Sequence, residues 1–318
     1  DAIEVISPST GARIGAIPCA DAELVDAAVR SAREALATSG WAGLTPRDRL
    51  RAMHAWAALI EENAEELARL EAICSSRPAA LARTGDVLVS AEQIRFFAEF
   101  ADKEAGTLVP TSDAQFGFIS DHPYGVVGAI TPWNFPISMA AWKLGPALAA
   151  GNAIVLKPSE MTPYTTLRLA ELAVEAGIPA GLVNVVLGDG PTTGTAITGH
   201  RGIDKVSFTG STRAGGAIME NIARTGIKPM TLELGGKSPM VVFADADLDV
   251  AAKSLETGIM PNAGQFCVAG SRILVEESIA DALAERLRAR FSTYAPTDTL
   301  ADQAGFSPII SDKQLRRI

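Results

Sequence analysis

The sequence has few of the residues that build disulfide frameworks, metal sites and histidine-based catalytic sites. Its 318 residues include three cysteines and three histidines. An odd, small number of cysteines in a long chain argues against a disulfide framework and favours a reducing compartment, so we expect a cytoplasmic protein. His54, His122 and His200 are far apart in the sequence, and none lies near another candidate ligand or nucleophile. We therefore expect no metal site and no histidine-containing triad.

Clustered positive charge and long apolar runs are also lacking. The formal net charge is −9 and no basic cluster is present, which argues against a nucleic-acid partner. The apolar stretch 137–150 is interrupted by Lys143 and Pro146, and it falls short of the roughly 20 residues that span a bilayer. The N-terminus has no charged region followed by an apolar run, so we expect no signal peptide and no membrane partner.

The chain does contain enough apolar residues for a large core, and its length favours two domains. The first hundred residues are predicted to be mostly helical; Thr45-Pro46, for example, is typical of a helix start. From residue 125 onward, short apolar runs alternate with helical segments, which predicts an α/β fold with a parallel sheet covered on both faces. The predicted strands begin at residues 125, 152, 182, 205 and 240.

Residues 105–124 interrupt this pattern. They are polar at first and then alternate in FGFISD, which predicts an extended excursion or hairpin and a candidate oligomer contact.

Three glycine-rich stretches are candidate phosphate sites. GSTRAG, residues 210–215, follows a predicted strand and opens a helix, where backbone N–H groups and the positive helix end can hold a phosphate. GDGPTTG, residues 188–194, has one residue too many for a dinucleotide fingerprint and is interpreted as a loop. GGKS, residues 235–238, lacks the glycine that a P-loop needs, because that position is Thr231.

Three further residues are candidates for catalysis. Cys267, in GQFCVAG, is either a small buried apolar residue or a nucleophile. With no histidine nearby, its acid–base partner would be a carboxylate. Glu233, in LELGGKSP, has apolar and glycine neighbours whose burial would raise its pKa; the alternative is a strand-end glutamate paired with a lysine. Asn134, in TPWNFP, offers an amide donor for an oxyanion.

These motifs, together with LKPSE at residues 156–160, resemble the aldehyde dehydrogenase superfamily in order and spacing. The resemblance implies a Rossmann-like NAD(P)-binding domain (residues 1–104 and 125–233), an oligomerisation segment (105–124) and an incomplete α/β catalytic domain (234–318). It also implies that Cys267 attacks an aldehyde, that Asn134 holds the oxyanion and that Glu233 activates water. A homodimer or homotetramer is expected.

The resemblance further implies NAD as cofactor, with NADP possible. Lys157 and Glu160 would face the adenosine ribose and Ser211 the pyrophosphate. The remaining implied cofactor positions are Ile130, Thr131, Pro132, Trp133, Ser159, Gly188, Phe208, Gly210, Ala214, Leu234 and Gly235. Positions that match the substrate tunnel are Phe135, Met139, Trp142 and Phe266, whose character predicts an apolar aldehyde.

The chain departs from the family pattern at its end. Family members continue well beyond the position that matches Ile318, and their Glu-x-Phe-Gly-Pro motif is absent here. This C-terminal truncation leaves two alternatives to an aldehyde-oxidising enzyme: a non-catalytic nucleotide-binding remnant of the fold, and a relative that transfers the acyl group to CoA. The presence of Glu233, Asn134 and Cys267 argues against the first, and Glu233 as a water activator argues against the second.

Overall fold

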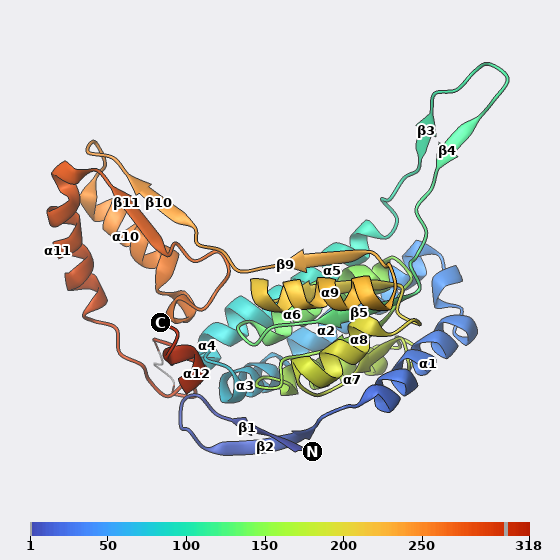
Figure 1. Ribbon diagram of the computed structural model, residues 1–318, viewed down its shortest axis with the longest axis horizontal. Coiled ribbons are helices and arrows are strands. Elements are labelled where there is room, and N and C mark those ends of the chain that lie inside the picture. The colour runs from blue at the N-terminus through green and yellow to red at the C-terminus, as the bar shows by residue number, and fades with distance from the viewer. Residues whose placement is uncertain (1, 302–304) are drawn as a thin grey trace.

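A computed structural model of the chain describes residues 2–301 and 305–318 (Figure 1). Its centre is a five-stranded parallel sheet in the order β7-β6-β5-β8-β9. The strands of this sheet are β5 (Val126–Ile130), β6 (Ala153–Lys157), β7 (Val183–Val185), β8 (Lys205–Thr209) and β9 (Met230–Glu233). The remaining strands are β1 (Ala2–Ile6), β2 (Arg13–Pro18), β3 (Thr107–Val109), β4 (Gly117–Ile119), β10 (Pro239–Val242) and β11 (Arg272–Val275).

Helices precede, connect and follow these strands. They are α1 (Ala22–Thr38), α2 (Pro46–Glu62), α3 (Ala64–Cys74), α4 (Ala79–Leu81), α5 (Leu88–Phe100), α6 (Pro136–Ala149), α7 (Tyr164–Glu175), α8 (Thr195–Gly199), α9 (Thr212–Thr225), α10 (Leu248–Ile259), α11 (Ala280–Phe291) and α12 (Asp312–Leu315). The mostly helical first hundred residues and the α/β alternation after residue 125 are thereby confirmed. None of the helices in the described ranges is long and apolar enough to cross a membrane.

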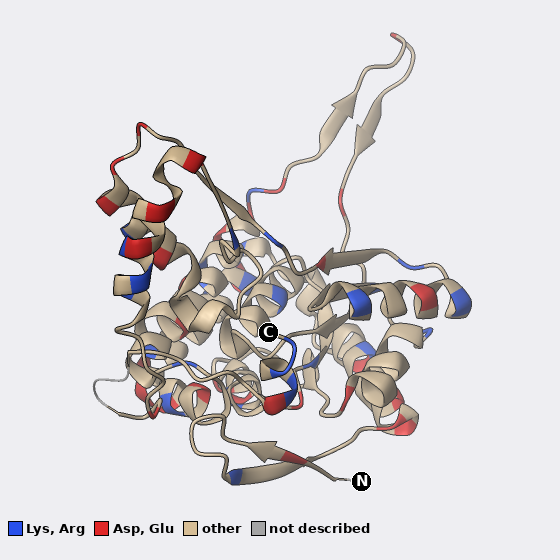
Figure 2. Ribbon diagram, turned by 60° about the vertical axis from the view of Figure 1, so that its left-hand side comes forward, with Lys and Arg blue, Asp and Glu red and all other residues tan. Residues whose placement is uncertain are grey.

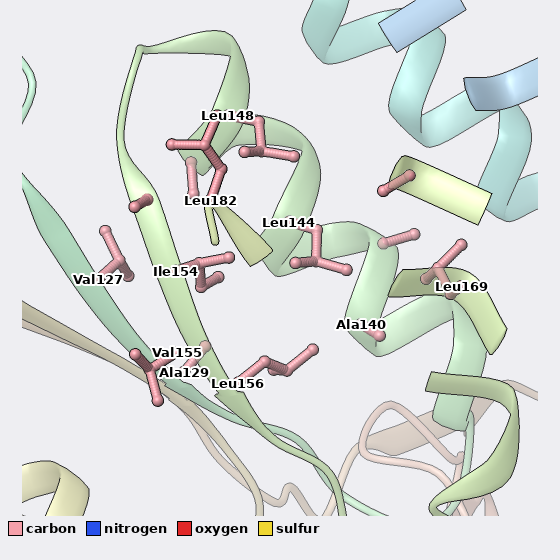
Figure 3. Close-up of a cluster of buried hydrophobic side chains, with 14 of the residues drawn as sticks. Val127, Ala129, Ala140, Leu144, Leu148, Ile154, Val155, Leu156, Leu169 and Leu182 are labelled. Atoms are coloured by element: carbon pink, nitrogen blue, oxygen red, sulfur yellow. The ribbon is translucent and has the colours of Figure 1, made fainter. Parts of the chain in front are cut away.

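The central sheet forms because its middle strands are apolar throughout. Every residue of β5 and β6 is buried, as the near-continuous apolar runs predict for strands covered on both faces. Figure 3 shows Leu144 and Leu148 of α6 beside Ile154 and Leu156 of β6, all fully buried. The chain moves outward from β5 to β7 and then returns to β8 on the other side of β5. With right-handed crossovers, this reversal places α6 and α7 on one face of the sheet and α8 and α9 on the other.

Two details of the predicted sheet are wrong. The strand predicted at residue 240, β10, pairs in parallel with β11 in a separate two-stranded sheet. The fifth strand of the central sheet is instead β9, which is not among the predicted strands. Its burial alternates because it lies at the sheet edge with one side toward solvent, so Met-Thr-Leu-Glu gives no apolar run. The antiparallel hairpin β1–β2 was likewise not predicted.

Residues 105–124 form the predicted hairpin. β3 and β4 pair in antiparallel register and project away from the body of the molecule (Figure 1). In Figure 2 the ribbons of these two strands are tan, because neither strand contains Lys, Arg, Asp or Glu, whereas charged residues flank the base of the hairpin. The hairpin exposes four large apolar side chains, those of Leu108, Phe116, Phe118 and Ile119.

Candidate active site

Most of the predicted site residues lie at or just after the carboxyl ends of the central strands; Cys267 lies in a loop that precedes β11. The loop after β5 carries Thr131 and Asn134, and the turn after β8 carries Gly210. Thr131 N–H donates to the Lys157 carbonyl and Gly210 N–H to the Glu233 carbonyl, each at 3.0 Å, so neighbouring strands end together. β5 and β8 are also the strands between which the chain reverses direction. In open α/β sheets, ligands bind in the crevice at such a switch point.

Lys157 is the centre of the first candidate cofactor region. Its buried ammonium group donates to the carbonyls of Gly188 (2.7 Å) and Pro158 (2.9 Å) and lies 3.6 Å from the Glu160 carboxylate. Burial lowers the pKa of Lys157, and the charge of Glu160 opposes that shift. A side chain at Gly188 would collide with Thr193, and the backbone φ of 150° there also favours glycine.

The other residues of this region cover the end of β6. Ile130 is buried, and Ser159 accepts a hydrogen bond from Met161 N–H at 3.3 Å. GDGPTTG is not a plain loop, because residues 190–194 form a short helical turn that runs into α8. Asp189 makes this possible by accepting from Thr192 N–H at 2.7 Å, as a helix-capping residue does.

The turn after β8 is the second candidate cofactor region, and it begins α9 as predicted. Ser211 caps the helix by accepting from Ala214 N–H at 3.2 Å. Phe208 is buried, and its ring fills the space beside Gly210. Leu234 packs beside Gly215, where a Cβ would lie 2.8 Å from its Cδ2. The exposed N-terminus of α9 leaves backbone N–H groups available for an anion.

Between these regions lie the residues that follow β5. Thr131 is buried and its hydroxyl oxygen has no partner among the described residues. Pro132 and Trp133 are half-buried, and Gly235, in the loop after β9, is exposed. A buried hydroxyl without a partner at the edge of a crevice fits a polar ligand.

Cys267 is exposed, which excludes its interpretation as a buried apolar residue; Cys74 is the fully buried cysteine. The preceding Gln265 holds the cysteine loop. Its side chain donates to the Pro308 carbonyl (3.1 Å) and accepts from Ile310 N–H (3.0 Å). The exposed thiol therefore lies in a loop that is fixed by the hydrogen bonds of the buried Gln265 side chain.

Asn134 reaches this same loop. Its half-buried side-chain amide donates to the Gln265 carbonyl at 2.9 Å, and Asn262 donates to the Asn134 carbonyl at 3.1 Å. The amide group thus finds its partner two residues before Cys267. Because a carboxamide has two N–H donors, one remains for another acceptor.

The expected burial of Glu233 is wrong, because its side chain is exposed. It is the last residue of the alternating edge strand β9, where Leu232 packs against the core and Glu233 lies on the solvent side. Its charge acts on Lys143 of α6. Burial lowers the pKa of Lys143 to about 8, and the charge of Glu233 opposes that shift.

The loop after Glu233 contacts the cysteine loop. A Cβ at Gly236 would lie 2.8 Å from the Cys267 carbonyl oxygen, so only glycine allows this close approach. The structure thereby brings together the segments of Asn134, Glu233 and Cys267, which come from three different parts of the chain. The histidines stay apart from them: His200, for example, contacts Asp26 at 3.1 Å.

Three residues of this region were missed as site residues. Gln265 and Asn262 make the bonds that join the loops, and their contacts leave no pattern in the sequence. Lys143 could have been found from the sequence, since it is the only charged residue in the apolar helix α6.

Of the substrate-tunnel positions, Phe135, Met139 and Phe266 are half-buried. Trp142 is exposed and packs edge-on against Phe97, with ring centroids 6.0 Å apart. No group of three or more His, Cys, Asp or Glu residues in the described ranges could hold a metal ion.

The parallel sheet with its switch-point loops defines an open α/β fold, and an exposed cysteine lies in a loop that contacts the Asn134 segment. The Aldehyde dehydrogenase family model matches residues 1–318, so the chain belongs to the aldehyde dehydrogenase family. This confirms the resemblance and the fold class. Curated relatives include the aldehyde dehydrogenases of Aspergillus niger (44% identical over 315 residues) and Alternaria alternata (42% over 315 residues). Each match covers 99% of this chain and 63% of the relative.

Solved structures of aldehyde dehydrogenases are also similar to this chain. The NAD+ complex of aldehyde dehydrogenase from Bacillus cereus is 41% identical, with a TM-score of 0.96, and the match covers 100% of this chain and 64% of that one. Indole-3-acetaldehyde dehydrogenase of P. syringae, solved as a cysteine-to-alanine mutant with NAD+ and IAA, is 40% identical with a TM-score of 0.96 over 99% of this chain and 64% of that one. The chain thus spans slightly less than two thirds of the length of the relatives it matches.

Proposed function

We propose that the protein oxidises an apolar aldehyde to the carboxylic acid, with NAD+ as the hydride acceptor and water as the source of the second oxygen. The observation that carries this proposal is the hydrogen bond from the Asn134 side chain to the Gln265 carbonyl. It holds an amide donor beside the loop of an exposed cysteine, at the switch point of a nucleotide-binding type of sheet. The family and its NAD+ complexes support the same reaction.

Cys267 is the proposed nucleophile. Its thiolate attacks the aldehyde carbon, and the carbonyl oxygen becomes an oxyanion. The free N–H of the Asn134 amide and the backbone N–H of Cys267 hold that oxygen. The adduct then loses a hydride and becomes a thioester. Glu233 takes a proton from the water that attacks the thioester. The carbon–sulfur bond then breaks, so the acid leaves and the Cys267 thiolate is restored.

The exposed position of Glu233 bears on this last step. An exposed carboxylate is in contact with water, so the water that attacks the thioester can reach it. Glu233 leads directly into the loop that contacts the Cys267 backbone through Gly236. The charge of Glu233 also interacts with that of Lys143 in α6.

The residues of the two cofactor regions fit NAD, which supplies hydride-accepting chemistry when bound. Glu160 would accept hydrogen bonds from the ribose hydroxyls and repel a 2′-phosphate, which favours NAD over NADP. The N-terminus of α9, capped by Ser211, would hold the pyrophosphate. Thr131 offers its unpartnered buried hydroxyl to the ligand that covers it.

The domain boundaries and the assembly belong to the same proposal. Residues 1–104 and 125–233 would form the cofactor-binding domain, and 234–318 the catalytic one. The hairpin 105–124 would mediate a homodimer or homotetramer, because its apolar side chains are exposed at a projecting hairpin. Free thiols at Cys19, Cys74 and Cys267 support a reducing, cytoplasmic location.

The test is NADH formation by the full-length protein with a panel of aliphatic and aromatic aldehydes, without CoA. We expect turnover with apolar aldehydes, and we expect Cys267→Ala to abolish it while NAD binding, measured by calorimetry, stays unchanged. Cys74→Ala is the matched control for a thiol outside the site. Full turnover in Cys267→Ala would exclude the proposed mechanism, and turnover only when CoA is added would identify the acyl-transferring alternative.

A further inference from the structure

A buried ion pair lies directly behind the Asn134 segment and has no part in the proposed chemistry. Arg77 follows α3, and its Nε donates to Asp86 Oδ2 at 2.7 Å. Both side chains are almost completely buried. Removing two charges from water is costly, and apolar residues of similar volume often replace such a pair without loss of stability. Stability alone is therefore a weak reason for this pair.

The pair contacts the residue that follows Asn134. The Arg77 guanidinium carbon lies 5.2 Å from the centroid of the Phe135 ring, within the range of a cation–π contact. The guanidinium thereby contacts an aromatic ring while its hydrogen bond to Asp86 orients the group. Phe135 in turn precedes Pro136, the first residue of α6.

A second buried group from the same region holds the chain just beyond the proline. Glu71 of α3 is fully buried, and its Oε1 accepts from Ile137 N–H at 3.3 Å. The segment is thus held at Phe135 and at Ile137. It is held at Asn134 by the hydrogen bond from the Asn134 side chain to the Gln265 carbonyl.

We infer that Arg77 and Asp86 are positioning residues for Asn134: by fixing the Phe135 ring, the ion pair sets the direction of the Asn134 amide toward the Cys267 loop. This inference rests on the proposed function. The donor of an oxyanion site must be aligned to a fraction of an ångström, and a misplacement of about 1 Å can cost about 100-fold in rate. A rigid aromatic ring held by a planar ion is a suitable support for such alignment.

The test is a double-mutant cycle of Arg77→Met with Asn134→Ala. In the full-length wild type we expect Arg77→Met to lower kcat/KM by roughly 10- to 100-fold. In the Asn134→Ala background the same substitution should cost less than about two-fold, because the donor that it aligns is already gone. NAD affinity and the rate of Cys267 alkylation by iodoacetamide should change less than about two-fold, since neither uses the oxyanion donor.

Arg49 provides a matched control. It is as buried as Arg77, and its Nε donates to the Ala149 carbonyl (3.0 Å) at the opposite end of the same helix α6. Arg49→Met should lower kcat/KM by the same factor in both backgrounds, as a general structural loss does. Arg77→Lys keeps the charge but loses the planar contact, so we expect it to restore activity only in part. Equal losses from Arg77→Met in the two backgrounds would overturn the inference.

A readout independent of turnover separates this inference from the proposed function. In hydrogen exchange, Arg77→Met should raise the exchange rates of the backbone amides of Asn134, Phe135 and Ile137, and Arg49→Met should not. If the wild type oxidises no aldehyde but this pattern is found, the proposed function fails and the positioning contact stands. If the wild type is active and those exchange rates are unchanged, the positioning inference alone is wrong.

Discussion

The region around the central sheet and the region around β10 and β11 are held together by cores of very different size. The first core joins buried residues from α1 to α9, including Trp41, Trp56 and Leu144. The second consists of Val242, Ala252, Leu255, Leu283 and Leu287, with partly buried neighbours. β10 and β11 pack one side against this small core, and Val241, Phe243 and Leu274 are exposed.

This difference divides the candidate active site. Asn134 and the candidate cofactor residues Lys157 and Ser211 lie in or next to elements of the large core, whereas Cys267 belongs to the region with the small core. The hydrogen bond between Asn134 and the Gln265 carbonyl crosses from one to the other. The geometry of the thiol relative to its proposed oxyanion donor therefore depends on a few contacts between two unequal parts.

The largest effect is expected for a cavity in the large core. Leu144→Ala, at a fully buried site between α6 and β6, should lower the free energy of unfolding by about 2–5 kcal/mol, as measured by denaturant titration. The matched variant is Leu283→Ala in the small core, where the side chain is 1% exposed. We expect Leu283→Ala to speed hydrogen exchange within residues 239–291 while β5 and β6 stay protected. Loss of protection in β5 and β6 would show that the two regions unfold as one unit.

The next largest effect is expected for the pH dependence of stability that Glu71, in the large-core region, confers. Burial raises the pKa of Glu71 to about 8, with the negative charge of Asp86 adding to the shift. The folded protein then keeps a proton that the unfolded chain releases near the ordinary glutamate pKa of 4.5. The associated stability is fully present below about pH 4.5 and is lost as the pH rises toward 8, by at most about 1.4 kcal/mol per pH unit.

Glu71→Gln keeps the shape and removes the titration. Thermal unfolding between pH 5 and 8 should therefore show a flatter stability profile for this variant than for wild type. The control is Glu66→Gln, at an exposed position one turn earlier in α3, which should leave the profile parallel to that of wild type. Parallel profiles for Glu71→Gln and wild type would show that Glu71 is ionised when folded.

The same division explains what could be predicted from the sequence. β5 and β6 were predictable because strands buried on both faces leave continuous apolar runs, and Ser211 because strand, glycine and cap follow one another locally. β9 could not be predicted in this way, because buried and exposed residues alternate along an edge strand. The pairing of β10 with β11 in a separate sheet could not be predicted either. The exposure of Glu233 and the bonds of Gln265 depend on which segments meet in space. The local sequence does not encode which distant segments come into contact.

The smallest effect on stability is expected at the hairpin, which lies outside both cores. Phe118 is 68% exposed, so Phe118→Ser should change the free energy of unfolding of a subunit by less than about 0.5 kcal/mol. If the hairpin is the proposed oligomer contact, the same substitution should lower the molar mass of the full-length protein in light scattering. Leu24→Ser on α1, where the leucine is 50% exposed, is the control for loss of an exposed apolar side chain and should leave the molar mass unchanged. An unchanged mass for Phe118→Ser would argue that assembly, if it occurs, uses another surface. A reduced mass with full turnover would show that the site between the two cores is complete within one subunit.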